Sequence, residues 1–117
     1  MKTMVLVVED SLGIQRGYKR VLEPTHTVIQ AFTEQAGYDL FAEHVEEIVA
    51  IIMDGLLTEN GRDNDTLDLT RHIREQGFTG PIIATSSNED IQSAQISAGC
   101  SHKAVKLDAV GELLRIL

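Results

Sequence analysis

Two fully apolar, largely β-branched segments of this chain each end abruptly at acidic residues. Residues 4–8 (MVLVV) are followed at once by Glu9 and Asp10, and residues 48–53 (IVAIIM) are followed by Asp54. Continuous apolar runs of this length are typical of strands that are buried on both faces of a parallel sheet. We therefore expect a layered α/β fold in which two buried strands each present carboxylates at their C-terminal ends.

Three further short segments favour strands, and helical patterns separate them. The additional strands are expected at residues 27–31, 82–84 and 102–105. Between the strands, apolar residues recur at the three- and four-residue spacing of a helix face, and start and stop signals mark the helix ends. Helices are expected from Ser11 to before Pro24, over residues 33–45, around residues 69–73 and ending at Gly77, from Ser87 to Gly99, and from Asp108 to the C-terminus.

Particular residues are expected at the helix ends and on the inner faces. Ser11 and Asp108 should cap the first and last helices, and Ser87 with Asp90 fits a capping box. The polar segment through residues 60–64 is expected to be a loop. The side chains expected to face inward are Ile14, Tyr18, Val21, Leu22, Ala36, Leu40, Phe41, Leu69, Ile73, Ile91, Ala94, Ala98, Val110, Leu113, Leu114 and Leu117.

Five strands alternating with five helices, without a long linker or an internal repeat, predict one doubly wound α/β domain with a parallel sheet. In such sheets, ligands bind at the carboxyl ends of the strands. Glu9 and Asp10 follow the first expected strand, Asp54 the third, Ser86 the fourth and Lys106 the fifth. These five side chains are therefore candidates for one shared site.

The residue types in this constellation point to phosphoryl chemistry. Three carboxylates brought together would repel one another unless a cation lay between them, and an all-oxygen ligand set that keeps some water suits Mg²⁺. The hydroxyl of Ser86 and the ammonium of Lys106 would then hold the oxygens of an incoming phosphoryl group, whose negative charge needs donors and positive partners. A carboxylate in such a site can act as the nucleophile.

Four stretches carry a resemblance to a known family. They are residues 5–11 (VLVVEDS), 51–54 (IIMD), 81–86 (PIIATS) and 99–106 (GCSHKAVK). In this order and at these spacings, the sequence resembles the receiver domains of two-component response regulators, including the chemotaxis-type single-domain receivers. The resemblance extends over essentially all of residues 1–117. It implies a flavodoxin-like (βα)5 fold with a five-stranded parallel sheet.

The resemblance also implies a Mg²⁺-dependent phosphoacceptor. Asp54 would take the phosphoryl group, and Asp10 and Asp54 would bind Mg²⁺ directly. Glu9 would act through a metal-bound water. The main-chain carbonyl of Leu56, two residues beyond the acceptor, would be a further ligand.

The remaining implied roles concern switching and partners. Ser86 would be the switch hydroxyl, and Lys106 would contact the phosphate. The donor would be a phosphohistidine on a sensor histidine kinase or a histidine phosphotransfer protein, and a downstream protein target would read the signal. The chain would catalyse only its own aspartyl phosphorylation and dephosphorylation, so we do not expect an enzyme that acts on a separate substrate.

Several positions depart from the family pattern. Leu57 and Thr58 replace the usual Met-Pro after the acceptor, and the loop that follows is longer than the family norm, which changes the rim of the pocket. Lys103 stands at the aromatic switch position, so we expect it to reach solvent beside the fourth helix. Leu107 replaces the proline that normally follows Lys106. The bond between them is therefore expected to be trans, because a cis bond before a non-proline residue costs about 2.5–4 kcal/mol. Lys106 is still expected to point to the acceptor aspartate.

Composition excludes some alternatives. A formal net charge of −8, from 18 acidic and 10 basic side chains, would repel nucleic acid and anionic bilayers, so direct nucleic-acid binding is not expected. No apolar run approaches the roughly 20 residues needed to span a bilayer, and we expect a cytoplasmic protein. Cys100 is the single cysteine and is expected to be a small buried side chain.

Two other functions remain to be compared with a phosphorylatable switch. A degenerate receiver that acts only as a phosphorylation-independent interaction module is suggested by Lys103, Leu107 and the altered loop. A flavodoxin-like nucleotide binder would need a glycine-rich phosphate loop after the first strand, which this sequence lacks.

Overall fold

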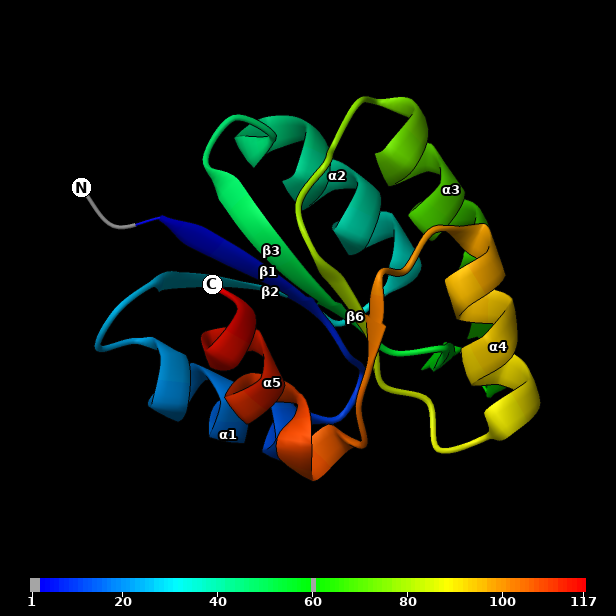
Figure 1. Ribbon diagram of the computed structural model, residues 1–117. Coiled ribbons are helices and arrows are strands. Elements are labelled where there is room, and N and C mark those ends of the chain that lie inside the picture. The colour runs from blue at the N-terminus through cyan, green and yellow to red at the C-terminus, as the bar shows by residue number, and fades with distance from the viewer. Residues whose placement is uncertain (1–2, 60) are drawn as a thin grey trace.

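The computed structural model describes residues 3–59 and 61–117, and in these residues it contains the five-stranded parallel sheet that the sequence predicts (Figure 1). The strands follow the order β2-β1-β3-β6-β7, which confirms a doubly wound sheet with its switch point between β1 and β3. The strands are β1 (Met4–Val8), β2 (Thr27–Ala31), β3 (Ile48–Met53), β6 (Ile82–Ala84) and β7 (His102–Lys103). The last of these is shorter than the expected range 102–105.

Within the described residues, five α-helices cover the two faces of this sheet. Figure 1 shows α1 and α5 on one face, and α2, α3 and α4 on the other. None of these five is long and apolar enough to cross a membrane. The helices are α1 (Leu12–Leu22), α2 (Glu34–His44), α3 (Leu67–Glu75), α4 (Glu89–Ala98) and α5 (Ala109–Ile116), and a 3₁₀ turn, η1 (Lys106–Asp108), precedes α5.

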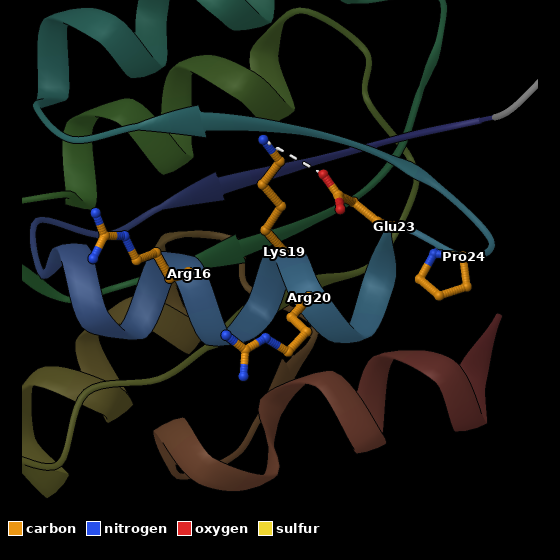
Figure 2. A pocket seen from close by; sticks show the side chains of 5 residues that line it. All are labelled: Arg16, Lys19, Arg20, Glu23 and Pro24. Carbon is orange, nitrogen blue, oxygen red and sulfur yellow. Dashed lines mark ion pairs between the residues drawn. The ribbon is translucent and has the colours of Figure 1, made fainter.

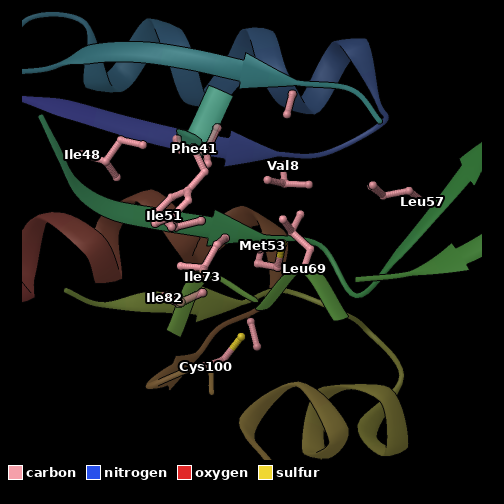
Figure 3. Close-up of a cluster of buried hydrophobic side chains, with 13 residues drawn as sticks. Val8, Phe41, Ile48, Ile51, Met53, Leu57, Leu69, Ile73, Ile82 and Cys100 are labelled. Atoms are coloured by element: carbon pink, nitrogen blue, oxygen red, sulfur yellow. The ribbon is translucent and has the colours of Figure 1, made fainter. Parts of the chain in front are cut away.

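Alternating side chains of the central strands build two separate hydrophobic cores. Leu6 of β1 lies in the core that includes Phe41 of α2 and the buried Cys100 (Figure 3). Val7, the next residue of β1, lies in the opposite core with Leu113 of α5. Burial on both faces explains why the central strands are apolar at every position and end where the first charged residue occurs.

Most helix ends agree with the sequence-based expectations. Ser11 Oγ accepts a hydrogen bond from the amide of Ile14 at 3.3 Å and so caps α1, as predicted. Gly77 and Gly99 follow α3 and α4 with φ angles of 93° and 135°. A side chain at either position would be strained, which explains why glycine ends both helices.

Two predicted caps are wrong in detail. Asn88, rather than Ser87, caps α4, because Asn88 Oδ1 accepts hydrogen bonds from the amides of Asp90 at 2.9 Å and Ile91 at 3.1 Å. Asp108 occupies the predicted position before α5 but its side chain makes no capping hydrogen bond. Its backbone is already helical, with φ −100° and ψ −8°, whereas side-chain capping requires an extended residue.

Three apolar side chains that we expected to face inward lie at the surface. Val21, Leu114 and Leu117 are exposed, with fractions of 53%, 41% and 48%. Each of these helices buries a stripe narrower than the apolar pattern suggests, and Gln15 is fully buried on the inner side of α1. Apolar spacing therefore identified the helices correctly but placed some residues on the wrong side.

The segment that we expected to be a polar loop forms a β-hairpin. Strands β4 (Leu56–Glu59) and β5 (Arg62–Asp65) pair in antiparallel register and make a second, two-stranded sheet. Gly61, next to the turn, has a φ of 75°, which glycine adopts readily. The expectation of a loop is wrong for these strands, while residue 60 lies outside the described residues.

Candidate functional site

The ends of β1 and β3 bring three carboxylates together. These strands are neighbours in the sheet, with Val8 beside Met53 in register, so the chain leaves both strands at the same edge. Oxygens of Glu9, Asp10 and Asp54 all lie within 4.8 Å of one another. The fold thus joins acidic residues that are separated by more than forty positions in the sequence.

Lys106, the first residue of the 3₁₀ turn η1, completes the charged cluster. Its Nζ lies 2.8 Å from Glu9 Oε1 and 3.2 Å from Asp54 Oδ2. The backbone at Lys106 is held in place because the hydroxyl of Tyr18 donates a hydrogen bond to the Lys106 carbonyl at 2.8 Å. No cis peptide bond occurs in residues 3–59 or 61–117, so the trans bond to Leu107 and the direction of the lysine are both as predicted.

The charged groups at this edge shift one another's pKa values. Glu9 is only 1% exposed, and burial raises the pKa of its carboxyl to about 7, although Lys106 and the amide of Ser11 act to lower it. Burial acts to lower the pKa of Lys106, but the carboxylates of Glu9 and Asp54 outweigh it and raise that pKa. One ammonium group therefore faces more negative charge than it can balance, and a bound cation would offset the remainder.

Asp10 is oriented by the hairpin. The amide of Thr58 in β4 donates a hydrogen bond to Asp10 Oδ2 at 2.9 Å. Burial acts to raise the pKa of Asp10, but the Thr58 amide and a hydrogen bond with Glu9 outweigh it and leave the pKa below its usual value. Asp10 therefore stays ionised over a wide pH range, as a cation ligand must.

The geometry of the hairpin leads us to expect that the carbonyl of Leu56 also faces this edge. Along an antiparallel strand, the peptide groups of alternate residues point to the same side. Thr58 points its amide at Asp10 and away from β5, so Leu56, two residues earlier, faces the same direction. The arrangement is compatible with the carbonyl ligand that the resemblance implies.

Ser86 lies at the end of β6, directly beside the residue that follows Asp54. It is buried, and its Oγ accepts a hydrogen bond from the amide of Asn88 at 3.2 Å. A Cβ placed on Gly55 would come within 2.8 Å of Ser86 Cβ and 3.0 Å of Gln95 Oε1. Glycine is therefore required after Asp54 because β3, β6 and α4 meet there.

Two buried glutamines support the strand ends, and the sequence analysis missed both. Gln15 Nε2 lies within hydrogen-bond distance of the carbonyls of Val7, Glu9 and Ala31, at 3.0, 3.0 and 3.1 Å. Gln95 Nε2 donates to the Met53 carbonyl at 2.8 Å. Their positions among helical apolar residues were the one available signal, because a polar side chain on an inner face must find backbone partners.

A broad hollow of about 580 Å³ lies on α1, away from the carboxylates. Figure 2 shows Arg16, Lys19 and Arg20 along this helix, with an ion pair of 3.4 Å between Lys19 Nζ and Glu23 Oε1. The hollow contains no residue of the predicted site. Its basic surface is solvent-facing, and the candidate site remains the edge where the parallel strands end.

Two residues near the end of the chain that differ from the family pattern, Lys103 and Leu107, lie at the surface. Lys103 is exposed and lines a hollow of about 350 Å³ beside Ile96 of α4, as predicted. Leu107 is 92% exposed, immediately after Lys106. Lys106 is thus close to Asp54, while position 103 carries an exposed lysine in place of an aromatic side chain.

No protein-family model and no curated protein sequence matches this chain. Solved structures do match: a response regulator receiver domain protein from Clostridium thermocellum is 18% identical, with a TM-score of 0.78 and coverage of 97% of this chain and 92% of that chain. A response regulator from Thermotoga maritima is 24% identical, with a TM-score of 0.75 and coverage of 99% and 94%. The receiver domain of a histidine kinase from Arabidopsis thaliana, complexed with Mg²⁺ and BeF₃⁻, is 22% identical, with a TM-score of 0.75 and coverage of 97% and 89%.

These comparisons confirm the fold that the resemblance implied. The chain has the flavodoxin-like fold of response regulator receiver domains, and the match extends over nearly its whole length. The carboxylates and Lys106 occupy the carboxyl edge of the parallel sheet, where ligands bind in folds of this type.

Proposed function

We propose that this chain is a phosphoaccepting response regulator receiver that takes a phosphoryl group onto Asp54 with the help of Mg²⁺. The observation that carries this proposal is the convergence of three carboxylates with Lys106, whose Nζ lies 3.2 Å from Asp54 Oδ2. Positive partners that already face the nucleophile stabilise the charge that develops during phosphoryl transfer, and they need not rearrange at that moment.

The donor atoms at the site suit a hard divalent cation. We assign Asp10, Asp54 and the Leu56 carbonyl as direct Mg²⁺ ligands, and Glu9 as a partner through a metal-bound water. The excess negative charge around Glu9 supports this assignment, as does the Arabidopsis receiver domain of the same fold, which is a complex with Mg²⁺ and BeF₃⁻. When bound, Mg²⁺ would neutralise charge on the carboxylates and on the incoming phosphoryl oxygens.

In the proposed reaction, an Asp54 carboxylate oxygen attacks the phosphorus of a phosphohistidine. A P–O bond forms as the P–N bond breaks, and the imidazole of the donor leaves with the electron pair of that bond. Lys106 and Ser86 hold the phosphoryl oxygens during transfer. Water later hydrolyses the acyl phosphate, so the chain would catalyse only its own phosphorylation and dephosphorylation.

The proposed partners follow from this chemistry. The donor is a sensor histidine kinase or a histidine phosphotransfer protein, and the output is a downstream protein target. A net charge of −8 disfavours direct contact with nucleic acid or an anionic bilayer, and we propose a cytoplasmic location for the switch.

A second candidate function is favoured by the surface around Lys103. A lysine at this position cannot fill the space beneath Ser86 as an aromatic ring would, because its charged head seeks water. The chain would then be a degenerate receiver that binds a protein partner without being phosphorylated. The two candidates differ in one measurable respect, the formation of an aspartyl phosphate.

Intact mass after incubation with acetyl phosphate separates them. We expect the wild-type chain to gain one phosphoryl group in the presence of Mg²⁺ and none after chelation. Asp54→Asn, which keeps the size of the side chain, should gain none under either condition, because an amide oxygen is a poor nucleophile toward phosphorus. An unmodified wild type would favour the interaction module, and an adduct on Asp54→Asn would move the acceptor elsewhere.

A further inference from the structure

The hairpin β4–β5 holds one carboxylate of the site directly. The Thr58 amide donates to Asp10 Oδ2 at 2.9 Å, while Asp10 itself is only half-buried. A half-buried carboxylate can rotate unless a partner fixes it, and this bond sets the direction in which the second oxygen faces. The position of β4 therefore determines how Asp10 presents itself to a cation.

Besides the bond from Thr58 to Asp10, other contacts attach the hairpin to the domain. Leu57 is fully buried in the core beneath α2 and α3 (Figure 3). On the return to α3, the amide of Thr66 donates to the Gly55 carbonyl at 3.2 Å. Next to the turn, the amide of Glu34 donates to Glu59 Oε1 at 2.7 Å. The first two contacts fix the base of the hairpin, whereas the third fixes its outer part.

The contact of Glu59 is a bond to the start of a helix. Glu34 is the first residue of α2, and its amide is one of those that no carbonyl within the helix can accept from. A carboxylate at this position is also favoured by the helix dipole. The carboxylates of Asp65, Glu59 and Asp68 all lie close enough to Glu34 to repel its charge. This repulsion opposes the placement of Glu59 beside the start of α2. The hydrogen bond from the Glu34 amide, at 2.7 Å, keeps the Glu59 carboxylate there in spite of the repulsion.

We propose that Glu59 is a positioning residue for the cation site, although it does not belong to the ligand set. It fixes β4 on the start of α2, and β4 in turn holds Asp10 through the Thr58 amide. This inference rests on the proposed function for the identity of the ion. The positioning itself is a property of the chain and can be measured without the ion.

The test combines amide hydrogen exchange by NMR with Mg²⁺ binding by calorimetry. In Glu59→Ala, we expect the Thr58 amide to exchange roughly tenfold faster, because the outer part of the hairpin opens more often. Mg²⁺ affinity should fall about three- to tenfold, somewhat less than the 10- to 100-fold typical when a direct partner of a ligand is removed. Glu59→Gln keeps an oxygen acceptor and should stay within about twofold of the wild type.

The matched control is Glu46→Ala, which removes an exposed glutamate beyond the far end of α2 and should change neither measurement. Unchanged Thr58 exchange in Glu59→Ala would overturn the proposal, as would faster exchange with unchanged or tighter Mg²⁺ binding. If the wild type itself binds no Mg²⁺, the proposed function is wrong about the ion. The exchange rates then still decide whether Glu59 holds Thr58 against Asp10.

Discussion

The carboxyl edge of the parallel sheet and the adjoining hairpin contribute to the same site in different ways. In the proposed function, the edge would supply the reactive groups, Asp54 and Lys106, which follow strands packed into two hydrophobic cores. The hairpin β4–β5 has one fully buried apolar side chain, Leu57, and contacts the site through the Thr58 amide, which donates to Asp10. Under the two proposals, buried strands would thus carry the chemistry, while a polar segment would adjust the position of a ligand.

This difference predicts that loss of the charged partner of Asp54 at the edge changes reactivity, whereas substitutions in the hairpin change affinity or stability. Substitutions in both regions are expected to weaken the site, but for different physical reasons. At the edge, charge is removed from the reacting groups. In the hairpin, backbone positions shift while every charged group of the site is retained.

The largest effect is expected for Lys106→Ala. Loss of the ammonium group removes the positive partner of Asp54 and should slow aspartyl phosphorylation about 10²- to 10³-fold, the usual cost of losing one such group. The measurement is the rate of adduct formation from acetyl phosphate at saturating Mg²⁺.

Lys103→Ala is the matched control, because it removes an exposed lysine three residues earlier. Its rate should remain within about twofold of the wild type. Equal slowing in both variants would show that general charge, rather than the contact with Asp54, accounts for the effect.

A second effect concerns the pH dependence of stability without Mg²⁺. Because burial raises the pKa of Glu9 to about 7, the folded state retains a proton that the unfolded state releases at lower pH. The free energy of unfolding should therefore fall as pH rises from about 4.5 to 7, by up to about 3 kcal/mol. Denaturant titrations at several pH values measure this slope. Glu9→Gln should flatten it, and a slope that persists in this variant would assign the effect to other groups.

Smaller effects are expected for two glycines, one from each region. Gly55→Ala should destabilise the fold by about 1–3 kcal/mol, because the new Cβ would meet Ile91, Ser86 and Gln95. Gly61→Ala should cost about 1 kcal/mol, since nothing crowds the position but its φ is 75°. Gly111→Ala, exposed and helical, is the control and should be neutral or stabilising. Thermal denaturation compares the three, and a greater loss at Gly61 than at Gly55 would contradict the contrast between the regions.

The sequence predicted the edge well because its signals are local. Residues 4–8 and 48–53 are apolar throughout and end at charged residues, so the strand limits and the acidic residues that follow them could be predicted together. The direction of Lys106 followed from its place after the fifth strand. The roles proposed for Ser86 and for the cation ligands rest on the resemblance and stay predictions.

The hairpin was missed because its polar composition resembles that of a loop. Within the hairpin, the backbone of Thr58 pairs with that of Asp63. The hairpin is attached to α2 through Glu59, whose partner is the backbone amide of Glu34, distant in the sequence. The Asn-Gly pair at positions 60–61 is the sequence signal that favours a hairpin here. The acceptors of Gln15 and Gln95 could not be found from helical spacing, since they are backbone carbonyls outside the helices, including those of Ala31 and Met53.

The bond from Gln95 to the Met53 carbonyl has a consequence for how a target could influence the site. It ties α4 to the residue immediately before Asp54, and the Gln95 Oε1 has no hydrogen-bond partner within the described residues. If phosphorylation alters the affinity of α4 for a target, thermodynamic reciprocity requires that the target alter the phosphorylation equilibrium by the same factor. A target that binds α4 would thus help to set the fraction of chains that are phosphorylated at equilibrium, and that fraction would be a property of the complex rather than of the switch alone.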